Sequence, residues 1–167
     1  DAFDYTLSDV AGGTATGHVS ISVLAADPPV ALDDSLTVDE DDVGIVAVLA
    51  NDTDPDGGAL TTSAIATQPA HGTASIASDG RIAYTPGLNF NGADSFSYEV
   101  ADGTGLKDTG VVLVAVNPVN DAPTAGNDPA STVEDTPVTI AVLANDADID
   151  LDALAVTVTS PGLGIAV

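Results

Sequence analysis

Apolar residues alternate with polar ones over several short stretches of the chain. In DSFSYEV, which starts at Asp94, the residues Phe96, Tyr98 and Val100 fall on one face and the polar residues fall on the other. A period of two is typical of a β-strand, whose successive side chains point to opposite faces. The same alternation occurs in HVSISV, in VTIAV and, less regularly, in TGVVLVAV, and turn signals such as SDG, PG, NG and DG separate the stretches. The pattern predicts an all-β protein with tight turns.

The chain also repeats itself. VLANDTDPDGGAL begins at Val48 and VLANDADIDLDAL begins at Val142, so the two copies lie 94 residues apart. With an offset of 93, the opening DAFDYTLSDV aligns with DSFSYEVADG, which places Phe3 and Tyr5 on the Phe and Tyr of FSYEV. We therefore expect Phe3 and Tyr5 to be core residues, and the run GIVAVL, which leads into the acidic stretch NDTDPDG, to be a strand.

A single repeat of about 94 residues accounts for the whole chain. Residues 1–26 match the C-terminal strands of one unit, residues 27–120 form a complete unit, and residues 121–167 match the N-terminal part of a third. Each unit is expected to be a sandwich of about seven short strands. The joints ADPP and NPVNDAP are short and restricted by Pro, so neighbouring units should be closely coupled. Since residues 1–26 and 121–167 supply different parts of one sandwich, their packing together, within or between chains, is a hypothesis.

Composition restricts the partners. The 167 residues include 44% hydrophobic ones, enough for a core, but 26 acidic residues against two basic ones give a net charge of −24. This charge repels phosphate backbones and anionic lipid, so neither nucleic acid nor a membrane is an expected partner, and metal cations are the natural counter-charge. No apolar run reaches the roughly 18 residues of a spanning helix. The abrupt start, without a visible signal peptide, is interpreted as that of an excised piece.

Carboxylates follow each VLAND run at every second position. Such a loop can turn several oxygens toward one point, and calcium prefers six to eight oxygen ligands. Without a cation, carboxylates ~6 Å apart would repel by about 3 kcal/mol per pair at an effective dielectric near 20. The sequence therefore predicts calcium at both runs without deciding which members bind: Asp52, Asp54 and Asp56 in the first, and Asp146, Asp148 and Asp150 in the second.

The same DxDxDG pattern opens an EF-hand loop. Counting Asp52 as position 1 places Gly57 correctly at position 6, but Ser63 stands at position 12, where a bidentate Glu belongs. In the later copy Leu151 replaces the Gly and Thr157 occupies position 12. Both copies follow a strand pattern without flanking helices, so an EF-hand is not expected, and the remaining ligands must come from elsewhere in the fold.

The unit resembles the cadherin-like tandem repeats of about 95 residues in large bacterial surface and secreted proteins, including RTX-type adhesins. The resemblance runs through VDEDDVGIVAVLANDTDPDG, QPAHGTASIASDGRIAYTPGLNFNGADSFSYEVADG and the joint VNDAP. It implies an extracellular protein built from Ig-like, cadherin-like Greek-key β-sandwiches in tandem. It also implies calcium at the joints, held by a Glu of the first domain, an acidic linker, and a DxD loop with a later Asp of the second.

Carried over position by position, the resemblance implies two ligand sets. The joint between the second and third units would use Glu40, Asn120, Asp121, Asp148 and Asp150, with Asp146 as a further candidate. The joint between the first and second units would use Asp27, Asp52, Asp54, Asp56 and Asp102. Because that joint reads ADPP in place of NDAP, it has no counterpart of Asn120, and its site is expected to be weaker or absent.

The remaining polar residues are expected to be structural. His18 and His71 are single, and five acidic residues outside the DxD runs are interpreted as solvated charges: Asp33, Asp34, Asp39, Asp42 and Asp128. The chain has no Cys, no paired histidines for zinc, no GxSxG and no phosphate loop. A glycosidase would need a carboxylate pair, but every acidic pair here is explained by the repeat. The chain is therefore not expected to be an enzyme.

Two functional hypotheses remain. The first is a calcium-stiffened structural spacer, or extender, in a large bacterial cell-surface or secreted adhesin, whose partners are calcium and the neighbouring repeats. The second is a cadherin-like binding module attached to a secreted polysaccharide-active protein, mediating calcium-dependent binding of carbohydrate or of like domains. Sugar platforms usually need exposed aromatic side chains, and after the core residues only Tyr84 and Phe90 remain for that role.

Overall fold

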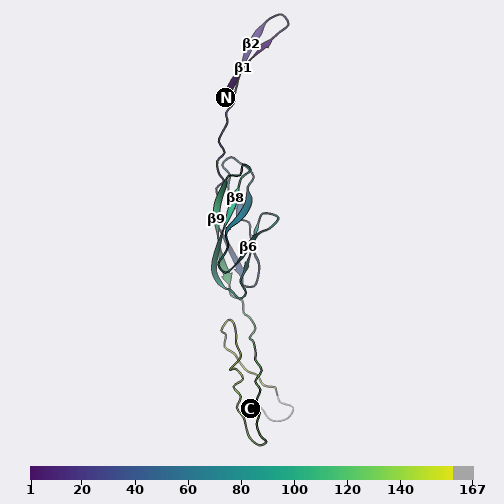
Figure 1. Ribbon diagram of the computed structural model, residues 1–167, viewed down its shortest axis with the longest axis vertical. Coiled ribbons are helices and arrows are strands. Elements are labelled where there is room, and N and C mark those ends of the chain that lie inside the picture. The colour runs from purple at the N-terminus through teal and green to yellow at the C-terminus, as the bar shows by residue number, and fades with distance from the viewer. Residues whose placement is uncertain (160–167) are drawn as a thin grey trace.

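The computed structural model describes residues 1–159 (Figure 1). Its regular structure consists of nine strands and one turn of 3₁₀ helix within those residues, so the all-β prediction is confirmed. Their bounds are β1 Ala2–Ser8, β2 Thr14–Ser20, β3 Asp34–Asp39, β4 Gly44–Val46, η1 Val48–Ala50, β5 Thr61–Thr67, β6 Gly72–Ile76, β7 Ile82–Pro86, β8 Gly92–Ala101 and β9 Lys107–Asn117. In this part of the chain, no helix is long and apolar enough to cross a membrane.

The central part of the chain is a sandwich of two sheets. One sheet has the strand order β3-β9-β8-β5, in which β3 runs parallel to β9 and the other neighbours are antiparallel. The other sheet is antiparallel and has the order β4-β7-β6. The predicted seven-stranded sandwich is therefore present as β3 to β9. The boundaries of the three predicted units, after residues 26 and 120, stay a prediction.

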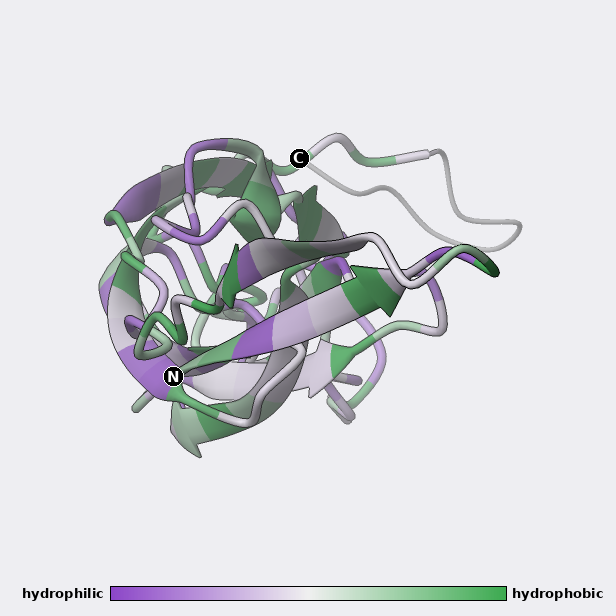
Figure 2. Ribbon diagram, turned by 90° about the horizontal axis from the view of Figure 1, so that it is seen from above, coloured by the Kyte–Doolittle hydropathy of each residue, from purple (hydrophilic) through white to green (hydrophobic). Residues whose placement is uncertain are grey.

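The core lies between the two sheets and follows the alternation in the sequence, which appears in Figure 2 as hydrophobic and hydrophilic segments along the ribbons. Phe96, Tyr98 and Val100 of β8 are 2%, 0% and 0% exposed, as predicted. From the facing sheet, Tyr84 stacks on Phe96 with ring centroids 6.1 Å apart. Inward valines of β9 complete this layer.

Three of the predicted strands differ from the structure. HVSISV, residues 18–23, is a strand only up to Ser20, where β2 ends. GIVAVL is a strand only over Gly44–Val46, after which η1 turns the chain into the acidic loop while Val48 stays fully buried. VTIAV, residues 138–142, forms no strand, so this prediction is wrong. In the central unit the matching β4 takes its hydrogen bonds from β7, and no counterpart of β7 lies beside residues 138–142 in the described chain. A strand without a partner leaves its backbone groups unpaired.

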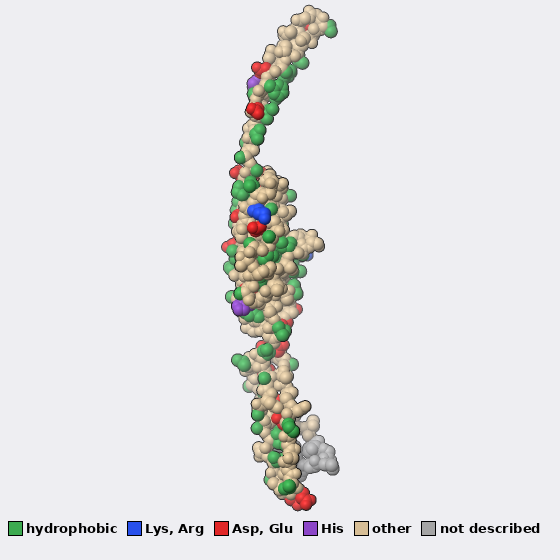
Figure 3. Space-filling model, in the orientation of Figure 1, with side chains coloured by type: hydrophobic (Ala, Val, Ile, Leu, Met, Phe, Trp, Pro, Cys, Tyr) green, Lys and Arg blue, Asp and Glu red, His purple; other side chains and the backbone are tan. Residues whose placement is uncertain are grey.

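The hairpin at the start of the chain and residues 121–159 lie on opposite sides of the central sandwich (Figure 1). At one end, β1 and β2 form an antiparallel hairpin by themselves. Phe3 and Tyr5 of β1 are 53% and 46% exposed, so the prediction that they are core residues is wrong within this structure. The reason is that no second sheet formed by residues 1–159 covers the hairpin, whose hydrophobic side chains lie along one side in Figure 3.

Candidate metal centres at the joints between units

The three alternate aspartates of the first acidic loop have different contacts. Asp52 turns back to the sandwich, where its Oδ1 accepts a hydrogen bond from the backbone N–H of Leu32 at 2.8 Å. Asp54 closes its own loop by accepting one from the N–H of Asp56 at 2.8 Å. Only Asp56 reaches the linker, where its Oδ2 accepts from the N–H of Asp27 at 2.7 Å.

The second acidic loop repeats this arrangement. Asp146 accepts from the backbone N–H of Gly126 at 2.8 Å, and Asp148 accepts from that of Asp150 at 2.9 Å. Asp150 then accepts from the N–H of Asp121 in the linker at 2.7 Å. The loop conformation is therefore the same in both copies, and in each copy the third aspartate is the one that contacts the joint.

The second loop keeps its shape even where the sequence departs from the first. Gly57 has a φ of 76°, and Leu151 at the matching position has a φ of 64°. A left-handed φ is costly for a residue with a branched side chain. An antiparallel bridge also ties each linker to its loop, Val30 with Thr53 and Thr124 with Ala147. These contacts hold the loop against the linker in both units.

Glu40 is the most buried acidic residue of the joint that follows the central sandwich. It is 3% exposed, and its carboxylate accepts hydrogen bonds from the backbone N–H of Val119 at 2.6 Å and from Nδ2 of Asn91 at 3.3 Å. No cationic side chain compensates its charge in the described chain, because Arg81 and Lys107 form their ion pairs elsewhere. In the sequence, Asn91 belongs to one of the NG turn signals, and that pattern does not mark it as a partner of Glu40.

Asp121 lies at the centre of the same joint. Its Oδ2 accepts a hydrogen bond from Nδ2 of Asn89 at 2.9 Å, and the Nδ2 of Asn120 donates to its carbonyl at 3.0 Å. Burial raises the pKa of the Asp121 carboxyl, and four neighbouring negative charges raise it further. We call these five acidic residues the joint cluster: Asp121, Asp150, Asp41, Glu40 and Asp148.

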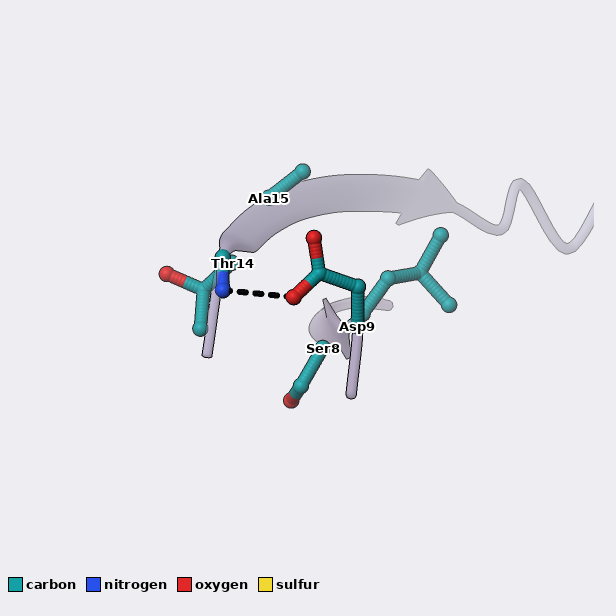
Figure 4. Close-up of a pocket in the computed structure, with 6 residues that line it drawn as sticks. Ser8, Asp9, Thr14 and Ala15 are labelled. Carbon is teal, nitrogen blue, oxygen red and sulfur yellow. Dashed lines mark hydrogen bonds between the residues drawn. The ribbon is translucent and has the colours of Figure 1, made fainter. Parts of the chain in front are cut away.

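At the joint before the central sandwich, Asp27 and Asp56 contact each other, because the backbone N–H of Asp27 donates to the Asp56 carboxylate. Asp102 turns its Oδ1 to the backbone N–H groups of Thr104 and Leu106, at 2.8 and 2.9 Å, and so closes the turn between β8 and β9. Asp9 does the same in the β1–β2 turn, where its carboxylate points across to the start of β2 (Figure 4).

The donor chemistry of the joint cluster fits calcium. Carboxylate and amide oxygens are its preferred ligands, and the cluster brings carboxylates from the central unit, the linker and the third unit together. Within residues 1–159, however, no three His, Cys, Asp or Glu side chains are already arranged to hold a metal ion. Several of the oxygens instead accept backbone N–H groups. Binding would therefore require some of these side chains to rotate toward the ion.

A second polar cluster, which sequence reasoning missed, lies around a tyrosine hydroxyl in the sandwich. The Oη of Tyr98 is 2.9 Å from the carbonyl of Leu32, 3.0 Å from Oδ2 of Asp34, 3.3 Å from both carboxylate oxygens of Asp52 and 3.4 Å from the carbonyl of Val48. One hydroxyl has one hydrogen to donate, so most of these oxygens receive none from it. The interpretation of Asp34 as a solvated charge is therefore wrong.

The titration of this cluster reflects the shortage of donors. Burial raises the pKa of Asp34, as do the charges of Asp52 and Asp33, while the Tyr98 hydrogen bond lowers it. Burial also raises the pKa of Asp52, and the charge of Asp108 adds to this effect. Asp34 and Asp52 recur as Asp128 and Asp146 in the third unit. This recurrence was the only signal of the cluster in the sequence.

The other singled-out aromatic and histidine residues have structural contacts. His71 stacks on Phe90 with ring centroids 4.4 Å apart, and His18 pairs with Asp4 across the hairpin. Tyr84 is fully buried, and its hydroxyl donates to Asp94 at 3.0 Å. Burial, together with the Asp94 hydrogen bond and charge, raises the pKa of Tyr84 to about 12.

The fold and the joints define a class of protein, the tandem β-sandwich repeat with acidic loops where successive units meet. The chain belongs to the bacterial Ig domain family, whose model matches residues 26–115 and 120–167. This is a family of structural modules. The resemblance to a cadherin-like and Ig-like repeat is thereby confirmed at the level of the Ig-like fold. No curated protein matches the sequence significantly.

Two solved structures are similar to parts of the chain. The human desmocollin-1 ectodomain matches 72% of this chain with 22% identity and a TM-score of 0.45. A nucleoside hydrolase-related hypothetical protein from Saccharophagus degradans, associated with carbohydrate metabolism, matches 56% of this chain with 16% identity and a TM-score of 0.41. The aligned region spans only 27% and 26% of those two chains. At these values neither similarity bears on function.

Proposed function

We propose that this chain is a calcium-stiffened spacer, or extender, repeat of a large bacterial cell-surface or secreted adhesin. The observation that carries the proposal is the position of Asp121 among four other carboxylates at the joint between the central and third units. The two basic side chains of the protein are paired elsewhere. A divalent cation is therefore the natural counter-charge for this joint.

The contacts of the linker support a stiffening role. Val119 donates its backbone N–H to Glu40 of the central unit, and Asp121, two residues later, donates to Asp150 of the third unit. The linker is thus held by carboxylates of both units. A cation shared by these carboxylates would remove their repulsion and fix the angle between the units, because each unit contributes ligands.

The residues that would hold calcium are the carboxylates of Glu40, Asp121, Asp148 and Asp150 and the side-chain oxygen of Asn120. Asp41, which the sequence reasoning did not select, joins them because its charge acts on Asp121. Asp146 is bonded to the backbone of its own unit, as Asp52 is in the central unit, and both are weaker candidates. Asp54 and Asp102 are also weaker candidates, because Asp54 bonds within its own loop and Asp102 within its own turn.

The proposed location is outside the cell. Calcium sites of extracellular modules typically bind with dissociation constants of about 10⁻⁴ to 10⁻³ M, which external calcium fills and cytosolic calcium does not. A bacterial Ig domain in tandem with further units is consistent with a long surface or secreted protein. Calcium would then stiffen the repeat after secretion.

The binding-module hypothesis has less support. Tyr84, one of its two candidate platform residues, is fully buried, and Phe90 is covered on one face by His71. The binding of carbohydrate or of like domains therefore stays a prediction from the sequence alone.

Small-angle scattering tests the spacer proposal on the whole chain. Measurements in millimolar calcium, in magnesium and in EDTA would be made at one ionic strength, so that screening of the −24 charge is constant. We expect calcium alone to lengthen the maximum dimension and sharpen the distance distribution. The matched variant Asp121→Asn keeps the side-chain shape and should lose the response. Identical wild-type curves in calcium and EDTA would overturn the proposal.

A further inference from the structure

The turn between β7 and β8 directs two side-chain amides at the joint cluster. The Nδ2 of Asn89 donates to Oδ2 of Asp121 at 2.9 Å, and the Nδ2 of Asn91 donates to Oε2 of Glu40 at 3.3 Å. An ionised carboxylate can only accept hydrogen bonds, so in each pair the amide nitrogen, and not the amide oxygen, must face the carboxylate. Within residues 1–159, the other donors to the carboxylates of the cluster are backbone N–H groups.

Asn89 has an unusual backbone conformation, which a second residue of the cluster shares. Its φ is 55°, and the φ of Asp41 in the β3–β4 turn is 64°. This left-handed region is uncommon for residues other than Gly, although Asn and Asp tolerate it best, and it persists where surrounding contacts determine it. Such a contact joins the two turns, because the backbone N–H of Asn89 donates to Oδ1 of Asp41 at 3.1 Å. The Asn89 amide is therefore presented by two turns that hold each other.

The bond from Asn89 to Asp121 crosses from the sandwich to the linker. Both residues are half-buried, so the bond is partly shielded from water. On its other side, Asp121 donates its backbone N–H to Asp150 of the third unit at 2.7 Å. A continuous path of hydrogen bonds thus runs from the central sandwich through the linker to the third unit, and none of its links requires a cation.

We propose that Asn89 is a positioning residue of the joint, whose amide, held in place by Asp41, fixes the Asp121 carboxylate and orders the linker before any cation is bound. The identity of the residue follows from its partner. In a chain with 26 acidic residues, an Asp at this position would face Asp121 with no hydrogen to donate and would add one more repulsive charge. The amide supplies the donor without the charge.

The Asn89 contact also has a consequence for calcium, and this part rests on the proposed function. Asn89 donates to one carboxylate oxygen of Asp121, so the other oxygen can bind an ion while the contact persists. Groups that hydrogen-bond a metal-ligating side chain typically change metal affinity by about 10–100-fold when they are removed. Asn89 would therefore strengthen calcium binding without touching the ion.

Amide hydrogen exchange of the whole chain in EDTA tests the contact without calcium. Asn89→Asp keeps a residue type that tolerates the left-handed backbone but removes the donor. We expect the backbone N–H of Asp121 to lose at least about tenfold of its protection, because hydrogen bonds to charged groups typically stabilise by that much or more. The exchanged pair, Asn89→Asp with Asp121→Asn, again places one donor opposite one acceptor and keeps the net charge. It should restore the protection of the N–H at residue 121.

Asn117→Asp is the matched control. The Nδ2 of Asn117 donates to Oδ1 of Asp39 at 2.8 Å, and this pair lies within the sandwich, between β9 and β3. The variant adds the same charge and breaks the same kind of bond, but it should leave the protection of the Asp121 N–H close to that of the wild type. Equal losses in Asn89→Asp and Asn117→Asp, or an exchanged pair as unprotected as Asn89→Asp, would overturn the proposal.

Calorimetric titration with calcium chloride measures the consequence for the metal. Asn89→Gly removes the amide and keeps the left-handed φ without strain. We expect its dissociation constant for calcium to be at least about tenfold higher than that of the wild type. A dissociation constant equal to that of the wild type would overturn the positioning role of Asn89. A wild-type chain that binds no calcium would overturn the proposed function instead, and the exchange measurement in EDTA would then decide alone whether Asn89 orders the linker.

Discussion

The carboxylate of Asp150 accepts a hydrogen bond from the backbone N–H of Asp121 at 2.7 Å. The N–H group satisfies one oxygen of Asp150, but it supplies no positive charge for the joint cluster. The matching contact between Asp56 and Asp27 has the same length at the earlier joint. The structure thus separates two properties of these aspartates, their hydrogen bonding to the linker and their charge, and substitutions can test the two separately.

Asp150→Asn keeps an oxygen for the N–H of Asp121 and removes one negative charge. In EDTA we expect its melting temperature to equal or exceed that of the wild type, because repulsion with Asp121 falls. In calcium we expect the variant to lose most of the wild-type rise, which at ~100 times the dissociation constant corresponds to about 2.7 kcal/mol per site. Thermal unfolding at fixed ionic strength measures both. Asp56→Asn is the matched control at the earlier joint, outside the joint cluster, and should retain most of the response. If Asp150→Asn responds to calcium as the wild type does, Asp150 is not a ligand.

Tyr98→Phe removes the hydroxyl that Asp34 and Asp52 share. Since the buried carboxylates lose a donor, we expect the free energy of unfolding to fall by about 1–3 kcal/mol in urea titrations. Tyr84→Phe is the control, because its hydroxyl contacts only Asp94, which also accepts backbone N–H groups. We expect a smaller loss for Tyr84→Phe. A larger loss for Tyr84→Phe than for Tyr98→Phe would show that the shared hydroxyl is not important for stability.

The raised pKa of Asp34 predicts a particular pH dependence. Its folded-state pKa lies above the ordinary value of 3.8, so the stability that it contributes is complete below pH 3.8 and is lost as the pH rises through the folded-state pKa. Asp34→Asn removes this loss. We expect the variant to be more stable than the wild type at pH 7, and the difference to shrink toward pH 4.

Asp94 provides the opposite case. Burial alone would raise its pKa, but the N–H groups of His71, Ser95 and Ala70 and the Tyr84 hydroxyl outweigh it, and the folded-state pKa lies below 3.8. Its stabilising contribution is therefore present above pH 3.8 and is lost as the pH falls through the folded-state pKa. Asp94→Asn should be less stable than the wild type at pH 7. Urea unfolding from pH 3.5 to 7 compares the two variants, and differences of the same sign would contradict the assignment.

Gly110→Ala tests the close approach of the Tyr98 ring to β9. The added Cβ would lie 2.6 Å from Tyr98 Oη, so the buried ring must shift away from Asp34 and Asp52. We expect a loss of about 1–3 kcal/mol, as for other overpacked cores. Gly103→Ala is the control, because a Cβ there would meet nothing within 4 Å. Equal stability of the two variants in urea would show that the ring adapts without cost.

The alternating pattern predicted the central sandwich well because its strands have partners. Phe96 and Val100 are buried as their period of two requires, and Leu113 of β9 points outward at 59% exposure. The same kind of pattern failed at residues 138–142 because a strand needs a neighbouring strand, and at Tyr5 because burial needs a facing sheet; local sequence does not say whether either is present. Burial of Tyr5 is a property of a complete sandwich and not of the hairpin.

The sequence predicted which residue types form the candidate site better than it predicted how their side chains are arranged. Spacing alone treats Asp52, Asp54 and Asp56 alike, whereas the structure directs one to the sandwich, one to its own loop and one to the linker. Those differences depend on which backbone N–H groups lie nearby, and the fold decides that. Asn89 and Asn91 were missed for the same reason, since they reach the joint from the turn between β7 and β8.

The parallel pairing of β3 with β9 has a mechanical consequence. Their register runs from Asp34 beside Val112 to Asp39 beside Asn117, and the chain enters through β3 and leaves through β9 at the other end of the ladder. Tension applied to the two ends of the unit would therefore slide the strands past each other along their length. In this shearing direction the ladder bonds share the load instead of opening one after another. The pairing of the first and last strands of the unit thus resists a force that is applied along the chain of units.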